Sequence, residues 1–149
     1  MTTKREFSAG GIVFRKEKKG FLWLLIKPNG HLEWRFPKGK INKSESSVAA
    51  AKREVKEEAG IEVKILEKIG EIKFFFTEDK QKIFKTVIFY LMEYVKESED
   101  GFESETEAIE WLSFNKAEKR LAFDKEQKLL REAEVLRQKI AKDSKGGFV

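Results

Sequence analysis

Hydrophobic runs separated by short polar stretches fill most of the chain, and their spacing predicts strands in the first two thirds. Phe21–Ile26 is continuously apolar, the pattern of a strand buried on both faces. Gly10-Gly11 lies inside another run, which indicates a bulge or a close backbone approach. The predicted strands are Phe7–Phe14, Phe21–Ile26, Ile61–Ile65, Ile69–Thr77, Ile83–Val95 and Ala108–Phe114, joined by a hairpin turn over Lys16–Gly20 and loops over Lys27–Lys43 and Lys96–Ser104.

A helical period replaces the strand pattern over Ser44–Ala59, where apolar residues recur every three or four positions. Ser44 can cap its N-terminus with Glu45 in the first turn, and Gly60 supplies the C-terminal stop. The apolar positions are Val48, Ala51, Val55 and Ala59.

Two further helices are predicted near the C-terminus. Asn115–Glu118 can cap a short one, and Asp124–Gln127 can start a longer one with an apolar face. Strands before, between and after helices favour an α/β (α+β) sandwich, with helices on both faces of a mixed sheet. We expect a single domain over residues 1–149, with an ordered core over about 7–142 and a tail over 143–149.

Composition narrows the function. The 149 residues, 40% of them hydrophobic and 13 of them Phe, suffice for a sizeable core. No apolar run is long enough to span a membrane, and the first residues lack a signal-peptide core, so we expect a cytoplasmic protein. Zero Cys excludes disulfides and thiolate chemistry, and a single His excludes multi-His zinc sites. The net charge of +5 would help attract an anionic substrate.

Acidic residues gather on the first predicted helix. Glu54, Glu57 and Glu58 fall within an arc of about 100°, beside the apolar stripe. If these like charges converge in a cleft, they repel, and a divalent cation would relieve the repulsion. Oxygen ligands favour magnesium or manganese over zinc. Arg53 can pair with Glu57 or Glu45 and so orient the carboxylates. The alternative is that this Glu-, Lys- and Arg-rich helix simply presents a solvated face.

The spacing of these residues resembles the Nudix box, Gly-x5-Glu-x7-Arg-Glu-U-x-Glu-Glu-x-Gly-U with U aliphatic. All nine fixed positions match over residues 39–61: Gly39, Glu45, Arg53, Glu54, Val55, Glu57, Glu58, Gly60 and Ile61. The approach Trp34–Gly39, the segment Lys85–Leu91 and the acidic stretch Glu105–Trp111 are similar to those of the diadenosine tetraphosphate hydrolase branch of that family.

The resemblance implies roles for individual residues. Metal ligands would be Glu54 and Glu58, with Glu57, the Gly39 carbonyl and Glu105 as further candidates. The catalytic base would be Glu54, with Glu105 as the competitor, while Arg53 holds the carboxylates in place. The substrate-binding candidates are Lys38, Lys85 and His31 for phosphate, and Trp34, Phe76, Phe89 and Tyr90 for stacking on adenine, with core packing the alternative for the aromatic residues.

The function that this resemblance implies is magnesium-dependent hydrolysis of diadenosine tetraphosphate to ATP and AMP, with manganese a substitute ion. Two alternatives stay open. One is a pyrophosphohydrolase acting on nucleoside triphosphates or RNA 5′ ends, and the other is an inactive Nudix domain that binds nucleotide or RNA as a regulator. The expected partner is a small nucleotide substrate. Neither a membrane nor an obligatory protein partner is implied, and nucleic acid enters only through the alternatives.

Overall fold

The computed structural model describes residues 2–146. Its elements, in chain order, are β1 (Lys4–Glu17), β2 (Gly20–Pro28), β3 (Lys38–Lys40), α1 (Ser47–Ala59), β4 (Ile61–Glu78), β5 (Gln81–Glu97), β6 (Thr106–Leu112), α2 (Phe114–Arg120) and α3 (Asp124–Gly146). The two strands predicted at 61–65 and 69–77 form the single strand β4. Register shifts between Ile65 and Glu67 and between Lys68 and Gly70 accommodate the polar residues that had indicated a break between two strands.

One sheet organises the chain, with strand order β4-β5-β1-β2-β6 and β3 paired with part of β1. The central pair β1–β5 is parallel, whereas the other pairs are antiparallel, so the sheet is mixed as predicted. At one end of β1, residues Ser8–Gly10 pair with β3, and at the other end Phe14–Glu17 pair with β2. This switch of partner along β1 brings β3 next to the first strand.

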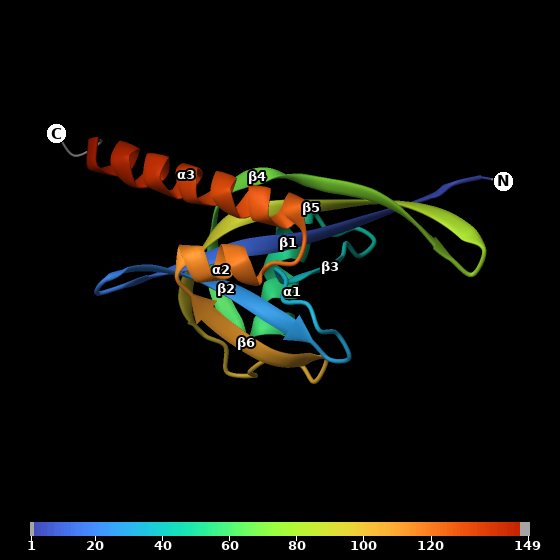
Figure 1. Cartoon of the computed structure of the whole chain (residues 1–149), viewed down its shortest axis with the longest axis horizontal. Helices are drawn as coiled ribbons and strands as arrows, with labels where there is room; N and C mark the ends of the chain where they lie inside the picture. The colour runs from blue at the N-terminus through green and yellow to red at the C-terminus, as the bar shows by residue number, and fades with distance from the viewer. Residues whose placement is uncertain (1, 147–149) are drawn as a thin grey trace.

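Helices cover both faces of the sheet (Figure 1). On one face, Ala50, Ala51 and Val55 of α1 pack in a cluster with Val13 and Met92. On the other face, the helices α2 and α3 contribute to a second cluster; its members from α3 are Leu129, Leu130 and Ala133, which join Trp23, Phe36 and Phe89. The predicted α/β/α sandwich is therefore confirmed.

The pair Gly10-Gly11 permits the close approach that the sequence indicated. A Cβ on Gly10 would collide with the Pro37 carbonyl oxygen, and a Cβ on Gly11 would overlap Met92 and Val55. The Gly11 amide also donates to the Pro37 carbonyl over 3.1 Å. The two glycines thus let β3 and α1 lie directly against β1.

The start of α1 differs from the prediction. Ser46, not Ser44, is the N-cap, because its side-chain oxygen accepts from the Ala49 amide over 3.0 Å. Ser44 has a positive φ of 71° in the preceding turn. Glu45 therefore lies outside the helix, where Arg53 binds it. The predicted stop is confirmed, since Gly60 adopts φ 69°.

The C-terminal helices also begin and end differently. Helix α2 starts at Phe114, with Ser113 rather than Asn115 as its N-cap. Helix α3 continues to Gly146, so residues 143–146 of the expected tail are helical, and residues 147–149 lie outside the described residues. Within the described range, no helix combines the length and the apolar character needed to cross a membrane.

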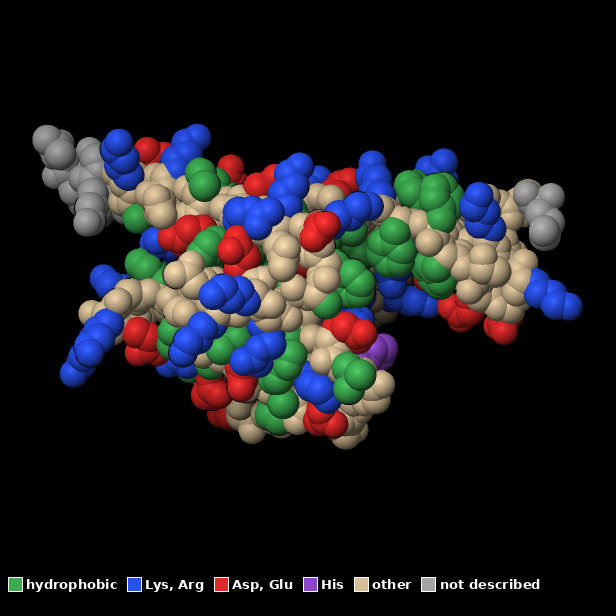
Figure 2. All heavy atoms as spheres, in the orientation of Figure 1, with side chains coloured by type: hydrophobic (Ala, Val, Ile, Leu, Met, Phe, Trp, Pro, Cys, Tyr) green, Lys and Arg blue, Asp and Glu red, His purple; other side chains and the backbone are tan. Residues whose placement is uncertain are grey.

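The β4–β5 hairpin projects beyond the body of the molecule (Figure 1). Hydrophobic side chains gather over it, flanked by basic ones (Figure 2). The Phe75 and Phe84 rings lie 4.6 Å apart, and the Lys82 ammonium is 4.6 Å from the Phe75 ring centre. Phe74, on the opposite face of β4 from Phe75, points back toward the site described below.

The reassigned cap gives a direct test of the fold. Ser46→Ala is expected to lower the free energy of unfolding by about 1 kcal/mol, because it leaves the Ala49 amide without its acceptor. Ser44→Ala is the matched control and should have a smaller effect, since Ser44 does not cap the helix. Urea unfolding of both variants measures the difference, and equal losses would contradict the assignment.

Candidate functional site

Arg53 organises the acidic end of α1. Its guanidinium donates to both oxygens of Glu45, at 2.7 and 2.9 Å, in the bidentate geometry that gives the strongest ion pairs. Its remaining N–H groups reach Glu54 Oε1 at 2.8 Å, Glu57 Oε2 at 3.1 Å and the Lys40 carbonyl at 3.0 Å. The Arg53 hydrogen bond lowers the pKa of Glu45 to about 2. Arg53 therefore holds three of the box carboxylates and ties α1 to β3.

The carboxylate of Glu54 lies directly against Gly39. A Cβ at position 39 would overlap the Glu54 carboxyl atoms, so only glycine permits this approach. Burial raises the pKa of Glu54, and the charges of Glu57 and Glu103 add to that effect against the opposing Arg53. Gly39 of the box thus leaves the space that the Glu54 carboxylate occupies.

Glu58 occupies the innermost position of the three. Its Oε1 accepts a hydrogen bond of 2.7 Å from the Lys38 backbone amide. Burial raises the pKa of Glu58 to about 7, with further contributions from the negative charges of Glu54 and Glu105. A group with this pKa is shared between its charged and neutral forms near neutrality, and a nearby cation would favour the charged form.

The loop between β5 and β6 closes over the C-terminal end of α1. The Glu103 amide donates to the Glu57 carbonyl over 2.8 Å, and Thr106 Oγ1 donates to the Glu58 carbonyl over 2.7 Å. The Glu105 carbonyl accepts from the Asn29 amide over 2.8 Å. The charge of Glu105 acts on Glu58 and that of Glu103 on Glu54. Glu103 was missed by the sequence analysis, although it precedes Glu105 by two residues in the same acidic loop.

Strand β3 joins two halves of the site. Successive residues of a strand point to opposite sides, so Gly39 faces Glu54 while the Lys38 side chain points to the other face of the sheet. There, burial lowers the pKa of Lys38, as do the charges of Lys85 and Arg35. The predicted phosphate ligands Lys38 and Lys85 are thus brought close together.

Lys38 lines a pocket of about 240 Å³, and the sequence did not indicate most of its other walls. Aromatic and aliphatic side chains make most of it, with Arg35 and Glu126 as its other charged members. The apolar lining residues are Ile72, Phe74, Val87, Phe89 and Phe123. Phe89, a predicted stacking residue, forms part of this wall, whereas Phe74 and Phe123 were not predicted.

Other predicted substrate residues lie elsewhere. Tyr90 is 8% exposed and its hydroxyl is 2.6 Å from Ser47 Oγ, so it packs beneath α1, in line with the core-packing alternative. Trp34 packs at the edge of the core and bridges to Leu121. His31 is exposed and lies 3.4 Å from Arg35, which makes it a neighbour of the pocket lining rather than of the box glutamates. Phe76 contacts Phe74 along β4, at a ring separation of 6.0 Å.

The donor set fits a hard divalent cation. Within residues 2–146, no three His, Asp or Glu side chains converge on one point by themselves, because Arg53 and the Lys38 amide hold the box carboxylates individually. The charge of Glu54 nevertheless acts on Glu58, and both carboxyl groups have raised pKa values. Oxygen donors whose repulsion is relieved by a cation are what magnesium and manganese select.

The family model described as the NUDIX domain matches residues 4–133. The chain belongs to the Nudix hydrolase family. It is 32% identical over 149 residues to the protein named MutT4 of Mycobacterium tuberculosis (strain CDC 1551 / Oshkosh), an alignment that covers 96% of this chain and 60% of that protein. The Nudix chain thus spans less than two thirds of this relative.

Solved structures share its fold. A Caenorhabditis elegans Ap4A hydrolase, in a binary complex, aligns with a TM-score of 0.71 and 24% identity, over 89% of this chain and 98% of that one. The dihydroneopterin triphosphate pyrophosphohydrolase of Escherichia coli aligns with a TM-score of 0.68 and 16% identity, over 89% and 97% of the two chains. As the Nudix family generally requires divalent metal, the carboxylate site and the family agree.

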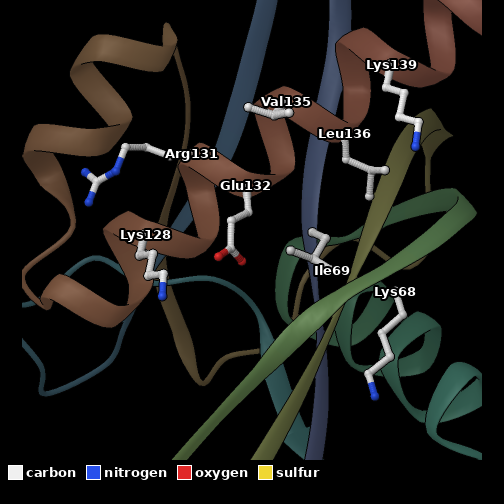
Figure 3. Close-up of a pocket in the computed structure, with 8 residues that line it drawn as sticks. All are labelled: Lys68, Ile69, Lys128, Arg131, Glu132, Val135, Leu136 and Lys139. Atoms are coloured by element: carbon white, nitrogen blue, oxygen red, sulfur yellow. The ribbon is translucent and has the colours of Figure 1, made fainter.

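A second pocket, of about 600 Å³, lies between α3 and β4 and is shown in Figure 3. Four basic side chains line it, with one carboxylate and three apolar residues: Lys68, Lys128, Arg131, Lys139, Glu132, Ile69, Val135 and Leu136. None of the box residues is among them. The groove is thus separate from the box residues of α1 and β3.

The raised pKa values predict a pH-dependent stability. Without divalent ions, the free energy of unfolding should fall by about 1 to 3 kcal/mol as the pH rises through the window between 4.5 and about 7. In this window the folded protein keeps a proton on Glu58 that the unfolded chain releases, and Glu126 acts in the same direction. Urea unfolding in EDTA at a series of pH values measures the slope.

A variant and the addition of Mg²⁺ identify the group that titrates. Glu58→Gln should remove about half of the slope, since Glu126 and Glu54, whose pKa values are also raised, supply the remainder. Excess Mg²⁺ should stabilise the protein more at about pH 8 than at about pH 6, because protons and the cation compete for the same oxygens. An unaltered slope in Glu58→Gln would show that Glu58 is not the titrating group.

Proposed function

We propose that this Nudix hydrolase cleaves dinucleoside polyphosphates, with diadenosine tetraphosphate giving ATP and AMP. The observation that carries the proposal is the geometry of β3. Gly39 meets the box carboxylates on one side of the strand, and the Lys38 side chain enters an aromatic-walled pocket on the other. A substrate with its base in the pocket would therefore carry its phosphates past Lys38 toward Glu54 and Glu58.

We propose a separate role for each group of residues in the site. Lys38 and Lys85 supply positive charge along the phosphate chain, at ammonium groups whose pKa values burial lowers. Glu54 and Glu58 would hold Mg²⁺, with Glu57 and the Gly39 carbonyl as further candidate ligands. When bound, the ion would neutralise charge on the phosphate oxygens as water attacks phosphorus in line. Arg53 is a positioning residue, since it fixes Glu54 and Glu57 without reaching the substrate itself.

Glu54 is our candidate for the catalytic base. Its raised pKa and its place against Gly39 suit a carboxylate that takes a proton from water. Glu105 is the competing candidate, because its charge acts on Glu58 from the loop that closes over α1.

The pocket beside Lys38 is the proposed seat of a nucleobase. Phe74 and Phe123 are both partly exposed, whereas Phe89 is buried behind them, so two rings are accessible to a planar ligand. The name of the C. elegans structure, an Ap4A hydrolase, and the branch motifs over residues 34–39 and 85–91 support a dinucleoside substrate. We place this reaction in the cytoplasm.

A pyrophosphohydrolase acting on nucleoside triphosphates is the second candidate. The similarity to the E. coli dihydroneopterin triphosphate pyrophosphohydrolase favours it. An inactive nucleotide-binding domain is less well supported, because the chain keeps the complete box and the raised pKa values of Glu54 and Glu58.

Product analysis tests the assignment. With Mg²⁺, diadenosine tetraphosphate should yield ATP and AMP in equal amounts, resolved by anion-exchange chromatography. Nucleoside triphosphates and ADP-ribose, offered at the same concentration, are expected to react more slowly. Faster release of pyrophosphate from a triphosphate would replace the proposed function with the second candidate.

Removal of the base should affect turnover more than binding. At saturating Mg²⁺, Glu54→Gln is expected to lower kcat by about 10²- to 10³-fold with little change in KM, since the amide oxygen can still coordinate the ion but the amide cannot accept the proton. Glu105→Gln is the matched comparison and should lower kcat far less. If Glu105→Gln causes the larger loss, the base lies in the loop instead of the helix.

A further inference from the structure

Glu126, in the first turn of α3, carries a buried carboxyl group that is not fully hydrogen-bonded by the described residues. Its side chain lines the pocket beside Lys38, only 8% of the residue is exposed, and its Oε1 has no hydrogen-bond partner among the described residues. A carboxylate near a helix N-terminus is favourable, but the exposed Asp124 at the start of the same helix already provides one. The burial of Glu126 therefore needs a different explanation.

The neighbouring cations do not satisfy it. Arg35 and Lys38 lower the pKa of Glu126 by their charge, yet burial outweighs them and raises it to about 7. Arg35 turns its terminal nitrogen toward His31 and Glu33, at 3.4 and 3.9 Å. Its Nε is likewise buried and has no partner within residues 2–146. Two residues that line one apolar pocket thus each bury a polar atom with no partner among the described residues, an acceptor on Glu126 and a donor on Arg35, and each is costly to bury alone.

A planar ligand that stacks on Phe74 and Phe123 and carries an N–H group and an acceptor on its edge would remove both costs. Adenine and guanine meet this description, because each has an N–H donor on its Watson–Crick edge beside an acceptor. Bare purine lacks the donor. Either protonation state of the carboxyl retains an oxygen that can accept, so the match does not depend on pH.

We infer that Glu126 is a specificity-determining residue that accepts a hydrogen bond from the edge of the bound nucleobase. The inference rests on the proposed function in one respect, that a nucleotide occupies this pocket. It adds that the enzyme distinguishes bases by an N–H donor, rather than by ring stacking alone. A site with a buried acceptor rejects an analogue without the donor, because the acceptor is then left unpaired.

The test compares adenine with purine, which differs by the amino group alone. Wild-type protein should bind AMP about 10- to 100-fold more tightly than purine riboside 5′-monophosphate by calorimetry. In Glu126→Met, a substitution of similar length, this ratio should fall to within about threefold. In Glu126→Gln, whose amide oxygen still accepts, it should stay above the value for Met. The matched control is Glu132→Met, an exposed position on α3, which should keep the wild-type ratio.

The melting temperature separates recognition from a structural role. Glu126→Met should melt a few degrees higher than wild type, because it removes an unpaired buried carboxyl. A lower melting temperature, or an adenine-to-purine ratio that Glu126→Met leaves unchanged, would overturn the inference. Because binding of monophosphates needs no hydrolysis, these measurements remain decisive even if no tetraphosphate is cleaved. The kcat/KM ratio for the adenine and purine tetraphosphates adds the corresponding test on the reaction.

Discussion

The site depends on holding several carboxylates at the C-terminal end of a helix, where the helix dipole makes negative charge unfavourable. Glu54, Glu57 and Glu58 lie in the last turns of α1, where the helix dipole is also negative, and two of them are partly removed from water. Arg53 and the Lys38 amide offset part of this cost. Both involve β3: Arg53 donates to the Lys40 carbonyl of that strand, and the Lys38 amide is part of it. The short strand is therefore what makes an otherwise unfavourable concentration of carboxylates compatible with a folded chain.

The parts predictable from the sequence are those set by local patterns. The period of α1, the glycine stop at Gly60 and most strand segments follow from neighbouring residues, and all nine box positions are readable in a single stretch. The N-cap was misplaced by two residues because Ser44 and Ser46 are equally suitable locally. The choice is made by Arg53, which holds Glu45 outside the helix from two turns away.

The remaining features depend on tertiary packing. Phe89 and Tyr90 belong to one apolar run, and only the sheet decides that Phe89 faces the pocket while Tyr90 packs under α1. The pocket itself draws on β4, β5, the segment before β3 and the start of α3. No local pattern links these segments. Glu126, among charged neighbours at a helix start, has the sequence signature of a solvated residue and is buried only because α3 docks on the sheet.

The parallel pairing of β1 with β5 has a consequence for synthesis. Lys4–Phe14 of β1 can pair with Ile83–Glu93 of β5 only after the latter has been synthesised. The central parallel ladder therefore cannot form until well over half of the polypeptide has left the ribosome. Everything between them, including β3 and α1, is translated before the ladder that supports it exists. Maturation of the carboxylate centre is thus expected to be a late event, coupled to completion of the sheet rather than to formation of its own helix.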